Sequence, residues 1–386
     1  MVDDYLETSQ KKIVADATAH LDPGLFPTAF CKILPDIAGD PAYCTIIHSD
    51  SAGTKAALAY MYYKETGNID VFRGIVQDAI VMNVDDLACV GALGPLILSN
   101  TLSRNKYLIP GDVVSTVIDE YNTYADWLTR LGISCTLGGG ETADVGDLIR
   151  TIDVVCTITA RLPRENVVDN GNIRPGDVIV GLASSGKCNY ESEWNSGIGS
   201  NGLTVARQVT LHHDYQDQFP ETYDPGIKDR VYTGTYHLTD EVKGLPIDFG
   251  RALLSPTRSF APIIRDILRQ HFPAIHGIIH CTGGGQTKCL KFGAGILYHK
   301  ENLFPVPRIF EIIQESSRKP WQEMYEIFNM GHRMEIMCLP ETAPDIIASA
   351  NAYGVDAQVI GICEASYDEN NHVSLDAAGE SFTYPE

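Results

Sequence analysis

Three aspartates lie in one of the most apolar stretches of the chain, where a carboxylate needs a partner. Apolar side chains cover every side of a helix drawn through Gly74–Gly91, yet the stretch contains Asp78, Asp85 and Asp86 and no lysine or arginine. Buried unpaired carboxylates are costly and usually meet a cation. Because Mg²⁺ prefers hard oxygen ligands, we predict that Asp78 and Asp86 bind a metal ion. Metal binding is equally open for Asp85, and all three could instead project from the helix end into water or cap a neighbouring turn.

A second polar segment, His48–Lys55, follows a β-prone run and opens a helix. The backbone N–H groups of Gly53 and Thr54 and the side chain of Lys55 could hold an anion at the helix N-terminus. Asp50, at the end of the strand, would give the predicted metal a further carboxylate. The spacing is not that of a Walker A loop, and a Gly-Thr pair before a helix is also an ordinary turn and cap.

Two glycine triplets each follow a β-prone run, and their repetition suggests that both halves of the chain offer backbone to a ligand. The first, Gly138–Gly140, is followed directly by Glu141. A carboxylate beside free backbone N–H groups suits metal ligation or the orientation of a reacting group, although helix starts also favour an acid. The second triplet lies in Thr282–Gly285.

Two further loops, Ser184–Gly186 and Ser200–Gly202, lie beside a predicted strand and a predicted helix and could grip a phosphate. Ser-Gly and Asn-Gly pairs are just as common in ordinary loops. The chain contains neither a nucleophile elbow nor an H-E-x-x-H motif, which argues against a hydrolase. The histidines are dispersed, and we expect even His212-His213 to be surface residues rather than a metal cage.

These residues must be positioned by a chain of 386 residues with 44% hydrophobic residues and a formal net charge of −21. The composition is globular and the length suggests two domains, which excludes a disordered or fibrous protein. So negative a field repels nucleic acid and anionic lipid, so we expect neither a nucleic-acid nor a membrane partner. A phosphorylated ligand must then be held by backbone N–H groups, a few cations or a bound metal.

Cellular location is predicted from the N-terminal segment, the longest apolar stretch and the cysteines. The segment Met1–Glu7 lacks the basic and apolar regions of a signal peptide, and the longest apolar stretch, Leu87–Leu98, is too short to span a bilayer. The ten cysteines are spread along the chain without a C-x-x-C pair, so we expect buried free thiols rather than a zinc site. Together these features predict a cytoplasmic protein.

β-prone and helical segments alternate, which is typical of an α/β architecture. A linker at Pro163–Pro175, rich in charge and turn formers, predicts domains at 1–165 and 172–386. Insertions are expected near 187–199 and 211–250, the second of them irregular. The predicted elements are strands at 43–48, 133–137, 152–158, 177–183, 335–339 and 358–363, and helices at 74–91, 112–131, 203–211 and 343–352.

Seven short motifs, in order from about residue 48 to residue 334, resemble those of the aminoimidazole ribonucleotide synthetase family, also called phosphoribosylformylglycinamidine cyclo-ligases. Each motif is short, but the preserved order makes the resemblance specific. The motifs are Asp50-Ser51-Ala52-Gly53-Thr54-Lys55, Asp78 to Leu87, Gly139-Gly140-Glu141-Thr142-Ala143, Gly176 to Gly186, Leu254-Ser255-Pro256-Thr257-Arg258, Thr282-Gly283-Gly284-Gly285 and Phe328-Asn329-Met330-Gly331.

The chain also departs from the family pattern. The family's Ser-Ser-Gly-Pro-His-Ser-Asn-Gly is interrupted here by Lys187–Gly199, and its histidine is missing. His332 and Arg333 replace the glycine and the small residue that follow the family's Phe-Asn-x-Gly. These departures bear on the substrate rather than on ATP, and Lys187 or His332 could replace the missing histidine.

The resemblance implies a set of site residues. ATP and Mg²⁺ are the implied cofactors, and Asp50, Lys55 and Glu141 would carry the catalysis, with Lys55 on phosphate. Metal ligands would be Asp50, Asp78, Asp86 and Glu141, and nucleotide contacts would come from Gly53, Thr54, Lys55, Asp78, Asp86, Gly138, Gly139 and Gly140. The ribonucleotide would contact Ser185, Gly186, Asn201, Gly202, Thr257, Arg258, Thr282, Gly283, Gly284 and Asn329.

The resemblance also implies an activity and an assembly. Members of the family transfer the γ-phosphoryl group of ATP to the formyl amide oxygen of formylglycinamidine ribonucleotide, and phosphate leaves as the imidazole ring closes. Their two α/β domains form a homodimer in which the N-terminal strands of both subunits pair into a β-barrel. We therefore expect this chain to be an ATP-dependent ligase of purine biosynthesis.

Two alternatives remain open from the residues. The first is another member of the superfamily: formylglycinamidine ribonucleotide synthetase, thiamine-monophosphate kinase, selenophosphate synthetase or the hydrogenase-maturation dehydratase. The chain ends Tyr384-Pro385-Glu386 without the last enzyme's reactive cysteine, and Cys31 has no adjacent glycine of the selenophosphate synthetase kind. The second is a nucleotide-binding paralogue without turnover, which the missing histidine and Arg333 would favour.

Overall fold

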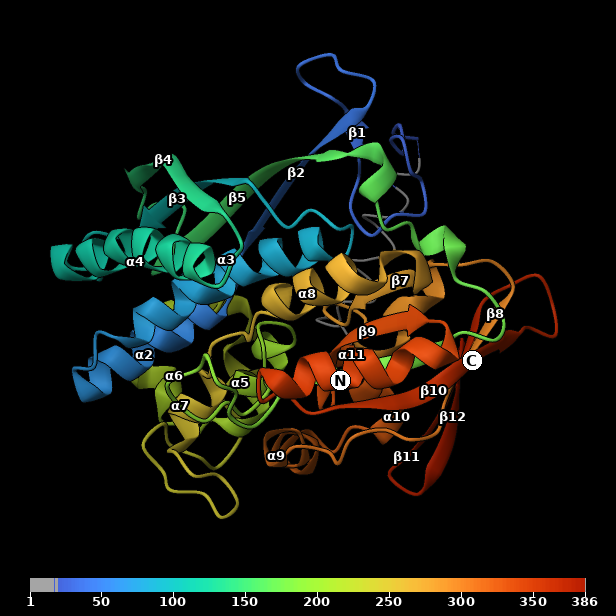
Figure 1. Ribbon diagram of the computed structural model, residues 1–386. Helices are drawn as coiled ribbons and strands as arrows, with labels where there is room; N and C mark the ends of the chain where they lie inside the picture. The colour runs from blue at the N-terminus through green and yellow to red at the C-terminus, as the bar shows by residue number, and fades with distance from the viewer. Residues whose placement is uncertain (1–16, 18–19, 386) are drawn as a thin grey trace.

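The computed structural model describes residues 17 and 20–385, and within them the strands form two separate sheets flanked by helices (Figure 1). One sheet has five strands and the other seven. The mixed α/β architecture predicted from the alternation of elements is confirmed. Residues 1–7, on which the prediction of a missing signal peptide depends, lie outside the described residues.

The first sheet is built by the N-terminal part of the chain. Its order is β1-β2-β5-β3-β4, and all neighbours are antiparallel except β3 and β4. The first glycine triplet lies inside β4 rather than in a loop after it, so the predicted end of that strand at Leu137 is wrong. The strands are β1 (Leu34–Pro35), β2 (Tyr43–Ser51), β3 (Leu96–Arg104), β4 (Cys135–Asp144) and β5 (Ile152–Pro163).

Three helices belong to this part of the chain: α2 (Lys55–Thr66), α3 (Val71–Ala88) and α4 (Gly111–Arg130). The last two lie side by side along one face of the sheet, where α3 contacts β2 and β5 and α4 contacts β4. The opposite face carries exposed apolar side chains, with Ile47 58% and Ile97 54% exposed. Because α3 is buried between the sheet and other helices, its apolar residues can cover all its sides.

The second sheet has the order β12-β11-β8-β10-β6-β9-β7, and only β11 and β8 run parallel. Its strands β7 and β9 are buried at every residue, so the sheet is covered on both faces at this edge. The strands are β6 (Val178–Ala183), β7 (Ile275–His280), β8 (Ile296–Lys300), β9 (His332–Cys338), β10 (Ala357–Ala365), β11 (His372–Ala377) and β12 (Glu380–Tyr384). The helices are α5 (Leu203–Thr210), α6 (Tyr215–Gln218), α7 (Phe249–Leu253), α8 (Ala261–His271), α9 (Arg308–Ser317), α10 (Trp321–Ile327) and α11 (Ala343–Ala352).

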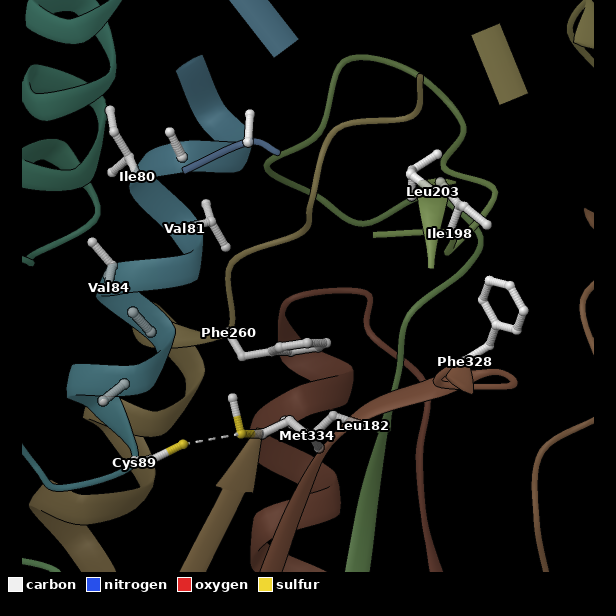
Figure 2. Packing of buried hydrophobic residues seen from close by; sticks show 14 of the residues in the cluster. Ile80, Val81, Val84, Cys89, Leu182, Ile198, Leu203, Phe260, Phe328 and Met334 are labelled. Carbon is white, nitrogen blue, oxygen red and sulfur yellow. Dashed lines mark hydrogen bonds between the residues drawn. The ribbon is translucent and has the colours of Figure 1, made fainter. Parts of the chain in front are cut away.

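The two parts share one apolar interface, and α3 is at its centre. Helix α8 contacts α3 on one side and α11 on the other. Figure 2 shows side chains of α3 facing Phe260 and strand residues of the second sheet, and the Cys89 Sγ lies 3.8 Å from the Met334 Sδ. The carboxylates of α3 are therefore placed between the two halves of the chain.

The described residues bear on further features of the fold. The segment between α5 and α7 holds only α6 and short 3₁₀ turns among the described elements, so it is irregular as expected, while its being an insertion stays a prediction. All ten cysteines are buried and free, as predicted. Among the described residues, no helix is both long enough and apolar enough to cross a membrane.

Candidate functional site

Asp86 lies near the C-terminal end of α3, and two histidines from different elements meet its carboxylate. The Nδ1 of His280, the last residue of β7, lies 2.7 Å from the Oδ1 of Asp86. The Nε2 of His48, on β2, lies 3.4 Å from the Oδ2. The side chains of Asp86 and His48 keep 12% and 26% of their surface exposed. This end of the helix is therefore accessible to a small ligand.

The hydrogen bonds around His48 and His280 place a proton on the Nδ1 of each ring. Arg333 Nε donates a hydrogen bond to His280 Nε2 at 3.1 Å. The proton of His280 therefore lies on Nδ1, which donates a hydrogen bond to Asp86. Asn83 donates its amide to two backbone carbonyls, so its Oδ1 accepts from His48 Nδ1 at 2.8 Å. With its proton on Nδ1, His48 turns Nε2 toward Asp86, and a second proton or a metal ion could lie between this nitrogen and the carboxylate oxygen 3.4 Å away.

Asp50 belongs to the same group. His48 and Asp50 are two residues apart on β2 and so point to the same face of the sheet, toward α3. Burial raises the pKa of Asp50, the Ser51 N–H bond opposes that rise, and the negative charge of Asp86 adds to it. A pair of carboxylates that disfavours its own ionisation is a suitable site for a cation.

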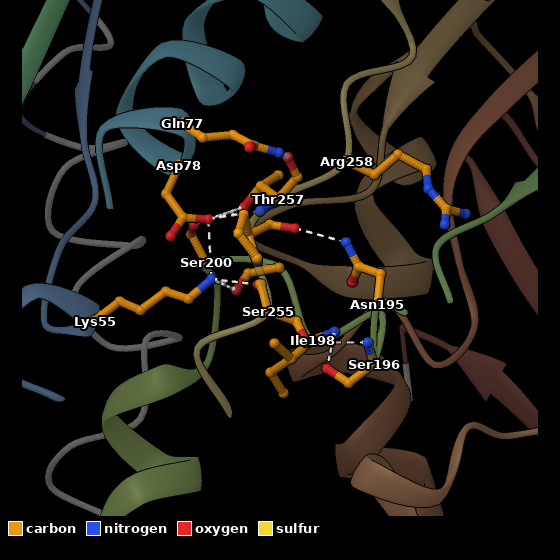
Figure 3. Close-up of polar contacts among 12 residues, drawn as sticks. Lys55, Gln77, Asp78, Asn195, Ser196, Ile198, Ser200, Ser255, Thr257 and Arg258 are labelled. Atoms are coloured by element: carbon orange, nitrogen blue, oxygen red, sulfur yellow. Dashed lines mark hydrogen bonds and ion pairs between the residues drawn. The ribbon is translucent and has the colours of Figure 1, made fainter. Parts of the chain in front are cut away.

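Asp78, at the other end of α3, is arranged differently (Figure 3). Its Oδ1 accepts from Lys55 Nζ at 2.9 Å and from the backbone N and the Oγ1 of Thr257 at 2.7 and 2.5 Å. Lys55 also donates to the carbonyl oxygens of Ser255 at 2.7 Å and Gly199 at 3.0 Å. Neither side chain of the ion pair has any exposed surface. Burial lowers the pKa of Lys55 despite the neighbouring carboxylate.

This geometry does not bring the ligands of the predicted shared metal site together within the chain. Asp78 and Asp86 are eight residues apart on one helix, which separates them by about 12 Å along its axis. Lys55 Nζ is enclosed by Asp78 and two backbone carbonyls, so in this structure it does not face a phosphate. The burial argument from the sequence correctly required a partner for Asp78, but that partner is Lys55 from outside the local sequence.

Asp85 has the role of a cap. Its carboxylate accepts from Ser259 Oγ at 2.7 Å and from the Phe260 N–H at 3.0 and 3.1 Å, immediately before α8 begins. The side chain is completely buried. Of the two roles left open for Asp85, the cap is the one observed.

Glu141 is not brought to the other carboxylates within this chain. Across the sheet, Asp50 on β2 pairs with Cys156 on β5, which pairs with Asn100 on β3. Asn100 in turn pairs with Gly140 on β4, so Glu141 is three strands away from β2. At the usual strand spacing this is about 14 Å. Glu141 is exposed on β4, which is an edge strand among the described elements. The four predicted metal ligands therefore separate into Asp50 with Asp86, Asp78 with Lys55, and Glu141 alone.

The first glycine triplet serves two different purposes. A Cβ on Gly140 would lie 2.0 Å from the Oδ1 of Asn100, so this glycine makes room for a neighbouring side chain. Gly139 has φ +120°, and a Cβ on it would meet nothing within 4 Å, so the surface above it is open. Gly53, with φ +58°, is equally open, and Thr54 contacts the Oγ1 of Thr204 at 2.8 Å. Open glycine backbone is consistent with a ligand approaching here.

The predicted substrate residues of the second half are mostly engaged inside the protein. Arg258 is 1% exposed, and its guanidinium binds Glu191 and the carbonyls of Ala183, Ser185 and Gly186. Asn329 accepts from Ser184 Oγ and donates to the Gly197 carbonyl. Thr257 binds Asp78, and Gly202 packs against the ring of Phe328. Ser185, Asn201 and Gly283 are partly exposed, Gly284 is partly exposed with φ +110°, and Thr282 is 5% exposed.

The insertion at 187–199 explains part of this burial. It folds back so that Gly186 and Asn195 pair as a β-bridge and Glu191 reaches Arg258. His332 does not replace the family's missing histidine in this structure, because its ring is buried and its Nε2 contacts Glu335 at 3.0 Å. Lys187 is exposed at the start of the insertion.

Asp86 lies in a group with Asp50, His48, His280 and Arg333, and the last three of these were not predicted from the sequence as site residues. For His48 a signal existed, since strand alternation places it on the same face as Asp50. For His280 the only signal was its position three residues before the second glycine triplet, Gly283–Gly285. Arg333 stands out in the sequence only as a departure from the family pattern, and nothing there connects it to a residue of β7.

Comparisons with known proteins agree with the motifs. Residues 31–162 match the family model of the AIR synthase related protein, N-terminal domain. The chain is 29% identical over 331 residues to the phosphoribosylformylglycinamidine cyclo-ligase of Methanocaldococcus jannaschii, a match that covers 86% of this chain and 81% of the relative. The resemblance thus extends through both halves.

Solved structures share the fold. The HypE-HypF complex structure contains a chain that matches with a TM-score of 0.56 and 16% identity, covering 97% of both chains. AaThiL complexed with AMPPCP and TMP matches with a TM-score of 0.54 and 12% identity over 100% of this chain and 98% of the other. Together these findings show that residues 31–162 match the N-terminal domain of the AIR synthase related proteins and that the chain as a whole is similar to phosphoribosylformylglycinamidine cyclo-ligases.

Proposed function

We propose that this chain closes the imidazole ring of aminoimidazole ribonucleotide in an ATP-dependent reaction on formylglycinamidine ribonucleotide. The observation that carries the proposal is the similarity to curated cyclo-ligases over 86% of the chain. The accessible carboxylates at the Asp86 end of α3 support an enzyme that handles a phosphorylated, metal-bound nucleotide. Purine biosynthesis is then the pathway, and ATP is the cosubstrate.

Asp86 and Asp50 would hold Mg²⁺ at this end of the helix. They fit the ion because the negative charge of Asp86 acts on Asp50 and His48 Nε2 lies 3.4 Å from Asp86, with no lysine or arginine among the groups that contact Asp86 or Asp50 directly in the described chain. When bound, Mg²⁺ neutralises negative charge on the transferring phosphoryl group. His280 donates a hydrogen bond to Asp86 Oδ1 and so holds that oxygen in place. The other carboxylate oxygen, Oδ2, is left for the ion.

The remaining predicted contacts belong to the same proposal. Gly53 and Thr54, together with the open backbone at Gly139, would contact the triphosphate. Ser185, Asn201 and Gly284 are the accessible members of the predicted ribonucleotide set. Arg258, Thr257 and Asn329 would act by holding the neighbouring loops, since their polar atoms already have partners inside the protein.

We further propose that the active form is a homodimer. The first sheet exposes Ile47 and Ile97 on the face away from the helices, and β4 presents an unpaired edge beyond the glycine triplet among the described strands. Exposed apolar sheet faces and free strand edges favour association with a second chain. In such a dimer Glu141, about 14 Å from Asp50 within one chain, could serve a site that includes residues of the partner subunit. The ten buried free thiols support a reducing compartment, the cytoplasm.

The proposed reaction has two steps. The amide oxygen of the substrate attacks the γ-phosphorus, and the bond from phosphorus to the bridging oxygen of ADP breaks. The neighbouring nitrogen then forms a bond to the amide carbon, and the carbon–oxygen bond breaks to release inorganic phosphate. Phosphate is a far better leaving group than an amide oxygen, which is why ATP is consumed.

The experiment is an assay of the untagged protein with ATP, Mg²⁺ and formylglycinamidine ribonucleotide. We expect ADP and the aromatic amine product to form in equal amounts, with no product when either Mg²⁺ or ATP is omitted. Binding of ATP without turnover would contradict the proposal and favour the paralogue without activity. ADP release with a different amide substrate of the superfamily, and none with this one, would reassign the substrate.

A further inference from the structure

The irregular segment between α5 and α7 brings three of the eleven histidines of the chain together around one carboxylate. The ring of His212 lies between those of His213 and His237, with centroids 4.2 and 4.5 Å away. Asp214 contacts all three rings: its Oδ2 lies 3.2 Å from His212 Nδ1 and 3.8 Å from His237 Nε2, and its Oδ1 lies 3.3 Å from His213 Nε2. We call these four residues the His212 cluster.

The backbone pairs that hold the cluster are specific. Leu211 pairs with Tyr236 and His212 with Gly234 as parallel bridges, so the residues that flank the two loops are fixed side by side. Gly234 is required there, because a Cβ would lie 2.1 Å from the carbonyl group of Thr210. His237 therefore lies beside His212 because the backbone of the two loops is paired, and not because of chance contacts between side chains.

The distances match a tetrahedral metal. Zinc binds histidine nitrogen and carboxylate oxygen at about 2.0–2.2 Å, which places neighbouring ligand atoms of a tetrahedron about 3.3–3.5 Å apart. The ligand atoms of His212, His213 and Asp214 all lie within 4.8 Å of one another, with separations of 3.2 and 3.3 Å between the two histidines and the two oxygens of Asp214. His237 Nε2 lies 3.8 Å from Asp214 Oδ2 and outside this group of three, so its ring must move closer to become the fourth ligand. The other ring nitrogen of His237 faces Asp240 Oδ2 at 3.9 Å, the arrangement that orients metal-bound histidines.

We propose that the His212 cluster binds a zinc ion through His212, His213, His237 and Asp214. Three imidazoles and one carboxylate suit Zn²⁺ and not Mg²⁺ or Ca²⁺, which prefer oxygen ligands. The four side chains are 25–69% exposed, so the ion can enter from solvent. The ion ties the turn before α6 to the loop at His237 and rigidifies the irregular segment. This site is independent of the proposed cyclo-ligase activity.

The test uses the untagged full-length chain. Excess Mg²⁺ is present so that the proposed magnesium site at Asp50 and Asp86 is occupied and does not take up zinc. After dialysis against Zn²⁺ and then metal-free buffer, we expect one zinc per chain by mass spectrometry of the metal content. Co²⁺ as a probe should give the intense visible absorption of a tetrahedral site. The ten cysteines are buried, including Cys281, which lies with His332 and Glu335 in the other group of possible ligands.

Two ligand variants and one control decide the assignment. His213→Ala and His237→Ala should each weaken zinc binding at least about tenfold, and together they should abolish it. His299→Ala, at a histidine 29% exposed on β8, should bind like the wild type. No stoichiometric zinc in the wild type, or unchanged binding in the double variant, would overturn the proposal. Circular dichroism shows that each variant is folded.

Discussion

Asp78 and Asp86 occupy the same helix, yet Asp78 has no exposed side-chain surface while Asp86 keeps 12% of its side chain exposed. At the Asp78 end, Lys55 neutralises the carboxylate and backbone carbonyls complete the shell of the ammonium. At the Asp86 end the neighbours are histidines and another carboxylate. The comparison teaches that a buried acid in an apolar helix is a functional residue only where the fold leaves its charge without a resident cation.

The closed end offers the largest expected effect, which is on stability. Removing one partner of a buried ion pair leaves an uncompensated charge, so Lys55→Met should lower the free energy of unfolding by about 3–5 kcal/mol. Asp78→Asn should cost a similar amount, and the double variant should cost less than the sum of the two. Urea unfolding at neutral pH measures all three. A KM for ATP that rises in Lys55→Met without loss of stability would show that Lys55 contacts phosphate instead.

The open end offers the largest effect on catalysis. Asp86→Asn removes the charge that would hold Mg²⁺, and we expect kcat to fall about 10²–10³-fold, equivalent to about 3–4 kcal/mol. The unfolding free energy should change less than in Lys55→Met, because Asn can still accept from His280. Asp126→Asn, on the exposed face of α4, is the matched control and should leave both quantities unchanged. Comparable loss of stability at both ends would break the comparison.

Orientation of Asp86 by His280 is a smaller effect. His280→Phe removes the donor to Asp86 Oδ1, and loss of such an orienting partner typically weakens metal binding about 10–100-fold. We expect the Mg²⁺ concentration for half-maximal rate to rise by this factor while kcat at saturating Mg²⁺ stays within a few-fold. His276→Phe, on the same strand and bonded to Asp177, should leave the Mg²⁺ dependence unaltered. Equal Mg²⁺ dependence in both variants would show that His280 does not orient the metal ligand.

The smallest expected effect is on pH dependence. Burial and the charge of Asp86 raise the pKa of Asp50 above its unfolded value of 3.8, so the folded protein binds more protons than the unfolded chain in that window. The contribution of Asp50 to stability therefore falls as pH rises through the window. Asp50→Asn should remove this slope and make the metal-free protein slightly more stable at pH 7. Unfolding midpoints in urea from pH 4 to pH 7, measured in both proteins, check the sign.

The elements were largely predictable because their signals are local. Three-to-four spacing predicted α4 to within one residue at each end, and α11 was predicted at its observed limits. Alternation and β-branched residues predicted the central strands β2, β5 and β6. The extent of β4 was not predictable, because glycines disfavour a strand locally and are tolerated here by the packing of Asn100 onto Gly140.

The site was predictable only in part. The sequence places Asp50 after a strand and Asp86 in a buried helix, and burial of a carboxylate implies a partner. Which partner each aspartate meets depends on residues far along the chain: Lys55 for Asp78, Ser259 for Asp85 and His280 for Asp86. No spacing rule connects these residues, so the separation of one predicted metal site into a closed pair, a cap and an open group required the structure.

The most direct test of the metal assignment is a binding titration with Mn²⁺ in place of Mg²⁺. Electron paramagnetic resonance of free Mn²⁺, in the presence of ATP, counts the ions bound by the wild type and by two variants of α3. We predict that wild type and folded Asp78→Asn bind Mn²⁺ alike, whereas Asp86→Asn loses the protein-dependent binding. Wild-type binding by Asp86→Asn, or its loss in a folded Asp78→Asn, would contradict the assignment of the metal to the Asp86 end of the helix.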